Sequence, residues 1–93
     1  MAPRRRRSRL EIMVDILEAI SRGGGARATW IMYEANMPYD RLKRYLSELL
    51  EKGLVRRVES GGESRYYITD KGLELVREYR RIKRLAEALG IDI

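Results

Sequence analysis

Glycine and proline cut this chain into short segments, and that punctuation limits its possible folds more than any other sequence feature. The breaks fall at residues 23–25, at Asn36-Met37-Pro38, at Gly53, at residues 61–62 and at Gly90. Glycine commonly ends helices, and the residue before a proline avoids the helical conformation. The breaks therefore predict four helices and one hairpin, all within a single domain of 93 residues.

The segments before Gly53 have helical spacing of their apolar residues. Ser8-Arg9-Leu10-Glu11 fits a capping box, which predicts a first helix starting near Ser8. After a very short strand at residues 26–28, Thr29 is the expected cap of a short helix that runs to about Ala35. A third helix is expected from Tyr39 to Lys52. Its predicted buried stripe consists of Leu42, Tyr45, Leu46, Leu49 and Leu50.

The segments after Gly53 predict a hairpin and a long helix. Residues 54–59 and 64–68 flank a Gly-Gly turn, which is typical of a β-hairpin. In such a hairpin, Tyr66 and Ile68 share one face and Tyr67 lies on the other. Thr69 or Asp70 is expected to cap a last helix that ends near Leu89.

This order of elements is that of a winged helix-turn-helix, a mainly α fold with a small β-hairpin (α+β). The sequence divides into a flexible basic arm at residues 1–7 and a winged helix-turn-helix domain at 8–70. A C-terminal coiled-coil dimerisation helix follows at 71–89, with a tail at 90–93. The helix from Tyr39 is the expected recognition helix, and the hairpin is the expected wing.

The net charge of +6 is concentrated at one end of the chain. Five arginines precede the first acidic residue: Arg4, Arg5, Arg6, Arg7 and Arg9. The rest of the chain is nearly neutral. A basic arm of this kind suits phosphate backbones through counterion release. The alternative is a terminus that only keeps the protein soluble.

Several classes of function are disfavoured by what the chain lacks. It has no cysteine and no histidine, which excludes disulfides and thiolate nucleophiles and removes the commonest general base and metal ligand. We interpret the stripe of Glu11, Asp15 and Glu18 as a solvated face turned away from DNA. The triple glycine is not followed by Gly-Lys-Ser/Thr, so it does not indicate a nucleotide site. We predict no enzyme, cofactor, metal or identifiable small-molecule effector. The chain has no long apolar run, so we expect no membrane association and a cytoplasmic, nucleoid-associated protein.

The candidate DNA-binding residues follow from the expected geometry, in which the helix from Tyr39 enters the major groove and the wing follows the backbone. Besides the arm they are Thr29, Tyr39, Arg41, Lys43, Arg44, Ser47, Arg56, Arg57, Gly62 and Arg65. The alternative for the arginines is an ordinary solvated surface. Trp30 is expected in the core or an interface rather than as a platform for stacking bases. Only Tyr39 and Tyr67 look available for stacking.

Four stretches of the chain resemble a known family. They are residues 10–17, 31–37, 45–55 and 67–72. Together they are similar to the small archaeal winged-helix DNA-binding proteins, above all the dimeric chromatin-associated group that ends in a coiled-coil helix. The resemblance covers roughly residues 9 to 89 and implies DNA binding through the recognition helix and wing, with dimerisation through the last helix. Pro38 departs from the family's small polar cap, and Asp40 supplies negative charge at that helix start instead.

The spacing of apolar residues in the last helix favours dimerisation independently of the family resemblance. Leu75, Tyr79, Ile82, Ala86 and Leu89 are spaced 4, 3, 4 and 3 residues apart, the spacing of a coiled-coil seam. The alternative is a helix that folds back on its own domain. The resemblance implies antiparallel pairing. A basic run at residues 77–84 flanks the seam and suits either DNA or nearby glutamates.

These observations favour a homodimeric protein that binds double-stranded DNA, as a transcription regulator or a nucleoid-associated protein. The alternative is a winged-helix scaffold that binds other proteins in the transcription or RNA machinery, because fold does not determine function. Asp40 and Glu48 on the recognition helix would suit a protein partner.

Overall fold

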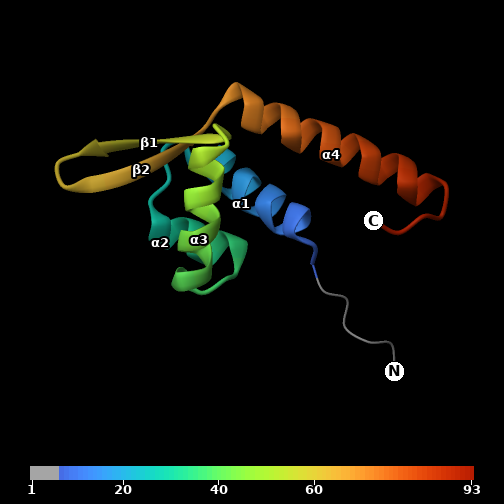
Figure 1. The fold of residues 1–93 in the computed structure, drawn as a ribbon, viewed down its shortest axis with the longest axis horizontal. Coiled ribbons are helices and arrows are strands. Elements are labelled where there is room, and N and C mark those ends of the chain that lie inside the picture. Colours follow the sequence, from blue (N-terminus) through green and yellow to red (C-terminus); the bar gives the residue numbers. More distant parts are fainter. Residues whose placement is uncertain (1–6) are drawn as a thin grey trace.

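The protein folds into four helices and one antiparallel hairpin, as the sequence predicts (Figure 1). The computed structural model describes residues 7–93. The elements are α1 (Arg9–Gly23), α2 (Ala28–Ala35), α3 (Tyr39–Glu51), β1 (Val55–Ser60), β2 (Glu63–Ile68) and α4 (Asp70–Ala88). Helices α2 and α3 form the helix-turn-helix, and β1 with β2 forms the wing. The winged helix-turn-helix class is confirmed.

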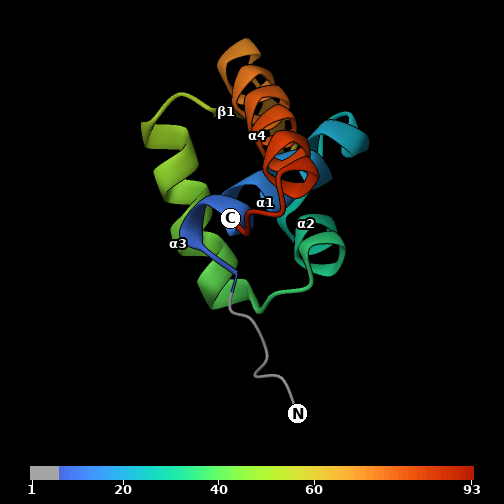
Figure 2. The same cartoon turned by 90° about the vertical axis from the view of Figure 1, so that its right-hand side faces the viewer.

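Helix α1 lies at the centre of the domain, between α2 and α3 (Figure 2). It starts with the predicted capping box: the Glu11 N–H donates to the Ser8 hydroxyl, and the Ser8 N–H donates to the Glu11 carboxylate. Its buried residues meet apolar residues of the other helices and the hairpin in one core. Ile16, Leu17 and Ile20 are completely enclosed there.

The start of α2 differs from the prediction. Thr29 is not the cap: the cap position is Arg27, and no side chain caps the helix. The expected strand at residues 26–28 is reduced to Ala26, which exchanges both backbone hydrogen bonds with Tyr66 of β2. This bridge holds Ala26 extended, and the chain enters the helix two residues later. Thr29 therefore lies inside the first turn of α2.

The turn between α2 and α3 is built by Asn36 and Pro38. Asn36 adopts a left-handed conformation (φ 53°) and donates its backbone N–H to carbonyls of the preceding turn. Asparagine tolerates this conformation better than most residues. Pro38 takes the cap position of α3, and no side chain caps that helix. Proline suits a helix start because its missing N–H would have no partner there. Asp40 lies in the first turn, where negative charge is favourable.

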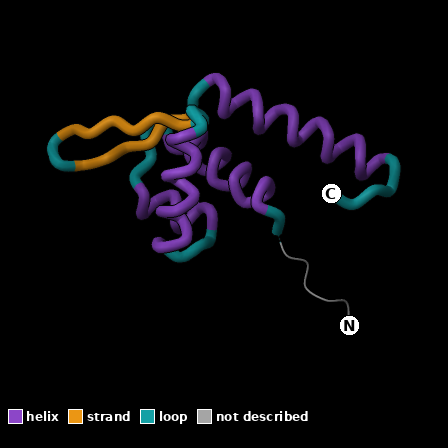
Figure 3. The backbone as a smooth tube through the Cα atoms, in the orientation of Figure 1, coloured by secondary structure: helices purple, strands orange, loops and turns teal. Residues whose placement is uncertain are grey.

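The wing is a regular hairpin that projects from the helical body (Figure 3). Val55 pairs with Ile68, and the pairing continues to Ser60 and Glu63 at the Gly61–Gly62 turn. The register confirms that Tyr66 and Ile68 share a face opposite Tyr67. Only the base of the wing joins the core, because exposed residues follow Val55 along β1. The tip is thus free to contact a partner.

Helix α4 is fixed to the domain at its first turn. The Thr69 hydroxyl accepts the Gly72 N–H and donates to the Gly53 carbonyl at 2.7 Å, so one side chain both caps α4 and ties it to the end of α3. A methyl group on Gly72 would lie 2.3 Å from the Leu54 carbonyl oxygen. Glycine is therefore required where α4 crosses the start of the wing.

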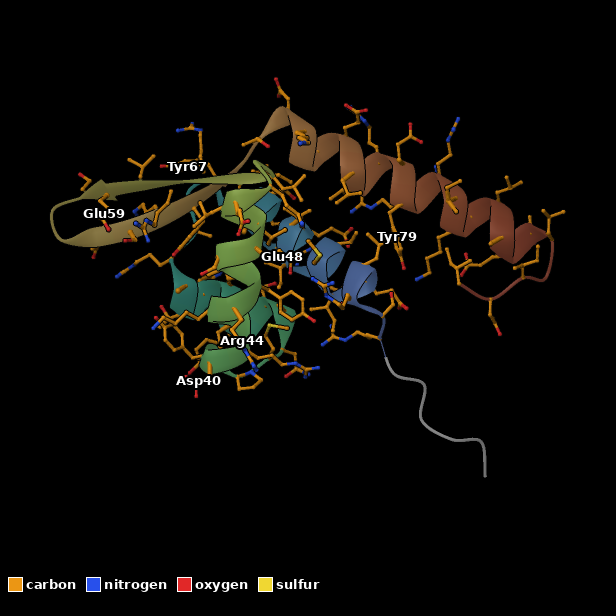
Figure 4. All side chains as sticks on the ribbon, in the orientation of Figure 1. Asp40, Arg44, Glu48, Glu59, Tyr67 and Tyr79 are labelled. Atoms are coloured by element: carbon orange, nitrogen blue, oxygen red, sulfur yellow. The ribbon has the colours of Figure 1, made fainter. Side chains whose placement is uncertain are left out.

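The two halves of α4 differ in their surroundings. Leu75, Val76 and Tyr79 pack against the core of the domain, and Tyr79 extends from α4 toward α1 (Figure 4). Farther along, α4 runs past α1, and Ile82 and Leu89 are exposed. The helix ends at a left-handed Gly90, and the following Ile91 N–H bonds back to the Ala86 carbonyl. Within residues 7–93, no helix is long and apolar enough to cross a membrane.

Candidate nucleic-acid interface

Helix α3 presents a polar side to solvent because its leucines turn inward. Leu42, Leu46 and Leu49 are buried at helical spacing, so the intervening side chains face outward. Arg44 and Asp40 extend from the first half of α3 in Figure 4. The predicted contact residues of this helix are all exposed: Tyr39, Arg41, Lys43, Arg44 and Ser47.

A hollow of about 310 Å³ lies along one flank of α3, and it gathers three arginines around one carboxylate. Arg41 and Arg44 of α3 line it together with Arg9 from the start of α1, Tyr45 and Glu48. The Arg9 guanidinium bonds both oxygens of Glu48 at 2.5 Å. Two of the three arginines in this hollow remain available for an anion.

The ion pair with Arg9 changes the electrostatics of Glu48. The hydrogen bond from the guanidinium lowers the pKa of Glu48, and the same bond raises the pKa of Arg9. Lys52, one turn along α3, adds a second positive charge at 3.7 Å from the carboxylate. Both groups stay charged at neutral pH, and Glu48 is largely neutralised by its neighbours.

The arginines of the wing all have partners within the protein. The Arg56 guanidinium lies over the Tyr67 ring, 4.9 Å from its centroid. Arg57 lies 3.9 Å from Glu59 on the same strand. Arg65 donates to the Gly25 carbonyl at 2.8 Å. All three are nevertheless exposed. The exposed ion pair between Arg57 and Glu59 contributes little to stability.

The basic arm is only partly within the described part of the chain. Arg4, Arg5 and Arg6 lie outside the described residues. Arg7 pairs with Asp15 of α1 at 2.5 Å, and Arg9 is held by Glu48. Asp15 is thus not simply solvated, and Glu18 of the same stripe pairs with Arg80 of α4. Among residues 7–93, no cluster of acidic side chains could hold a metal ion.

The predicted DNA-binding residues do not all meet in one region. Arg9, Arg41 and Arg44 meet in the hollow beside α3. Thr29 and Arg65 instead line a groove of about 600 Å³ between the end of α1, the start of α2 and the wing. Gly62 lies at the wing tip with a left-handed backbone (φ 80°).

Two aromatic residues differ in exposure from the expectation. Trp30 was expected in the core or an interface; it is 37% exposed at the groove beside the wing, which excludes the core, and Tyr33 beside it is 79% exposed. Tyr67, expected to be available for stacking, is only partly exposed and is covered by Arg56. Helix α2 consists almost entirely of apolar residues. Its two polar residues, Thr29 and Glu34, are exposed beside Trp30 and Tyr33, but two residues make only a weak signal of the exposed side.

Comparisons with solved structures agree with this geometry. The chain is 27% identical to Sso10a-2, a DNA-binding protein from Sulfolobus solfataricus, covering 89% of this chain and 85% of that one with a TM-score of 0.77. The resemblance to small archaeal winged-helix proteins is thereby confirmed. A MarR family transcription regulator, SP03579, is 26% identical with a TM-score of 0.76. The alignment covers 84% of this chain and 54% of that one, so the chain spans about half of the regulator.

A more distant structure shares the fold alone. MepR, a transcription regulator of the Staphylococcus aureus multidrug efflux pump MepA, is 18% identical, with 84% and 60% of the two chains covered and a TM-score of 0.73. No curated protein matches the sequence. The family profile described as winged helix-turn-helix matches residues 6–87, which is most of the chain. With the helix-turn-helix of α2 and α3 and the hairpin that follows it, the chain belongs to the winged helix-turn-helix family.

Proposed function

We propose that the protein is a homodimer that binds double-stranded DNA, either as a transcription regulator or as a nucleoid-associated protein. Helix α3 would enter the major groove, while the wing and the basic arm would contact the backbone. Residues 8–70 would bind DNA as the winged helix-turn-helix domain, and the helix at residues 71–89 would serve dimerisation. The proposal rests above all on one observation: Arg41 and Arg44 of α3, the expected recognition helix, line one hollow together with Arg9 from the start of α1.

The electrostatics of α3 favour DNA over a protein partner. The scaffold alternative depends on two carboxylates of α3, Asp40 and Glu48. Arg9 and Lys52 neutralise Glu48, and Asp40 lies at the helix start, where its charge is balanced by the helix dipole. The cations Arg41, Lys43 and Arg44 therefore dominate the exposed side of the first turns. A cationic helix surface of this kind suits base edges and phosphates.

Dimerisation would use the distal half of α4. Ile82, Leu85 and Leu89 are 50%, 57% and 66% exposed, on a helix whose proximal half is already packed on its own domain. Large apolar side chains grouped on one exposed helix face indicate an interface. A second copy offers a matching face, since the symmetry of a homodimer brings identical surfaces together. Two linked recognition helices could then contact two half-sites.

The test is fluorescence anisotropy of labelled random-sequence duplex DNA as a function of salt. We compare the full chain with a version that lacks residues 2–7 and with the double variant Arg41→Ala/Arg44→Ala. The double variant should lower affinity about tenfold and reduce the salt slope by about two, because each lost phosphate contact removes about one counterion. Unchanged binding by the double variant would contradict the assignment of α3. Loss of binding only with the arm deleted would assign the affinity for DNA to the arm.

The choice between regulator and nucleoid protein depends on sequence preference. A preference of about a thousandfold or more for one site over random DNA would identify a regulator. Selection of bound sequences from a random duplex pool measures this preference directly. A pool that stays random after selection would identify a nucleoid protein.

A further inference from the structure

The groove between α1, α2 and the wing combines exposed aromatic rings with cations. Trp30 and Tyr33 are three residues apart on α2 and are therefore neighbours on its surface. Three arginines line the same groove: Arg22, Arg27 and Arg65. Figure 2 shows α2 and α3 on either side of α1, so this groove is separate from the hollow beside α3.

Glycines hold the walls of this groove close together. A methyl group on Gly23 would lie 2.8 Å from the Trp30 ring, so part of the ring rests directly on the backbone at the end of α1. A methyl group on Gly25 would lie 2.7 Å from the Tyr67 hydroxyl oxygen. Arg65 adds its hydrogen bond to the Gly25 carbonyl. The loop, the wing and the Trp30 ring are thus positioned before any ligand binds.

The charges in the groove favour an anion. Arg22 pairs with Glu34 at 3.3 Å, while Arg27 and Arg65 share Glu63 at 3.1 and 3.5 Å. Three guanidinium groups therefore face two carboxylates. All of these pairs are solvent-exposed, and such pairs cost little to exchange. A polyanion with several phosphates can replace the two carboxylates and also pair with the guanidinium group whose charge they leave unbalanced.

We propose that this groove binds single-stranded nucleic acid, with bases stacked on Trp30 and Tyr33 and phosphates held by the surrounding arginines. Stacking platforms within a cationic groove are the general means of binding single strands. In a duplex the bases already stack on one another, and their faces cannot reach the rings. Occupation of the groove therefore distinguishes single strands from the duplex proposed for α3.

Trp30 provides a direct probe, because it is the single tryptophan of the chain. We titrate the full protein with an oligothymidylate and an oligouridylate of equal length and follow the tryptophan emission. Base stacking should quench it saturably with both, and the tighter of the two identifies DNA or RNA as the preferred strand. A duplex of the same length should leave the emission nearly unchanged. No quenching by either single strand, or equal quenching by the duplex, would overturn the proposal.

A pair of single-residue variants separates this groove from the rest of the surface. Tyr33→Ala should weaken single-strand binding at least fivefold, since stacking contributes about 1–3 kcal/mol per base. Tyr33 is 79% exposed, so its removal should leave the unfolding temperature unchanged. Leu73→Ala changes an exposed apolar side chain of α4 that does not line the groove, so this control variant should bind single strands normally. Equal losses in both variants would overturn the assignment. Arg41→Ala/Arg44→Ala tests the duplex proposal separately.

Discussion

Helices α3 and α4 are both amphipathic, but they bury their apolar sides to different extents. Leu42 and Leu49 of α3 are completely buried in their own domain. Ile82 and Leu89 of α4 are 50% and 66% exposed, although Val76 on the same helix is buried. The apolar side of α3 is thus buried within its own domain, and the side exposed to a partner is polar. On the distal half of α4, Ala86 of the predicted seam is buried within the chain, but the larger apolar side chains are exposed, which suits contact with a second copy.

The largest expected effect concerns the buried side of α3. Leu42→Ala should destabilise the domain by about 2–5 kcal/mol, because it removes methyl groups and leaves a cavity among enclosed neighbours. Chemical denaturation measures this loss. Leu85→Ala is the matched control on α4, and in the monomer it should cost far less, since its side chain is 57% exposed. Equal destabilisation of the monomer by both variants would remove the distinction between the two helices.

The next effect concerns the exposed side of α4. Ile82→Asp/Leu89→Asp should weaken the proposed dimer by about 3 kcal/mol, or about a hundredfold, because a carboxylate without a partner is costly to bury in an interface. Sedimentation equilibrium measures the dissociation constant. The helix content of the monomer should stay unchanged, since both positions are exposed within one chain. A wild-type chain that remains monomeric at high concentration would contradict the interface outright.

The contrast between these helices could be predicted only in part from the sequence. The spacing of Leu75, Tyr79 and Ile82 correctly indicates an apolar stripe. The pattern does not show that the first two residues pack on their own domain. That division depends on how far α1 extends beneath α4, which is a property of the packed structure. The prediction of a coiled coil over residues 71–89 therefore stays untested, and we restrict the proposed dimer interface to the distal half of this helix.

The helix caps were predicted only in part, again because packing between distant residues is not visible in a local pattern. Ser8 with Glu11 and Thr69 were predicted correctly, because each satisfies backbone groups within its own turn. Thr29 was wrong because a distant residue, Tyr66, holds Ala26 in an extended conformation and moves the helix start. The bond between Arg9 and Glu48 joins residues far apart in the chain. No pattern of spacing identifies such a contact before the fold is known.

A third prediction compares the charges on the two helices. Arg77→Ala/Arg84→Ala removes two exposed arginines from α4, as Arg41→Ala/Arg44→Ala does from α3. The α4 variant should bind duplex DNA with the salt slope of the wild-type chain, while the α3 variant loses about two units of slope. Anisotropy at several salt concentrations measures both. Equal losses would mean that the basic run of α4 also contacts DNA.

The smallest expected effect concerns the ion pair that neutralises Glu48 on α3. Its pKa is lowered by the hydrogen bond from Arg9, so Arg9→Gln should raise it toward the ordinary value of a glutamate. A carboxylate with a lowered pKa stabilises the folded state above its unfolded pKa. That contribution is lost as pH falls through the folded pKa. The pair is exposed, so the change in unfolding temperature should be small.

Carbon-detected NMR of the Glu48 carboxyl group measures this titration directly. Arg41→Gln is the matched control, since Arg41 lines the same hollow but the bond to Glu48 comes from Arg9. It should leave the pKa of Glu48 lowered. If Arg9→Gln left that pKa unchanged, the lowered pKa of Glu48 would not depend on Arg9 of α1. The polar side of α3 would then carry an unneutralised carboxylate, and a protein partner would regain support at that surface. A raised pKa in Arg9→Gln, with weaker duplex binding, would show that the start of α1 adjusts the charge of α3.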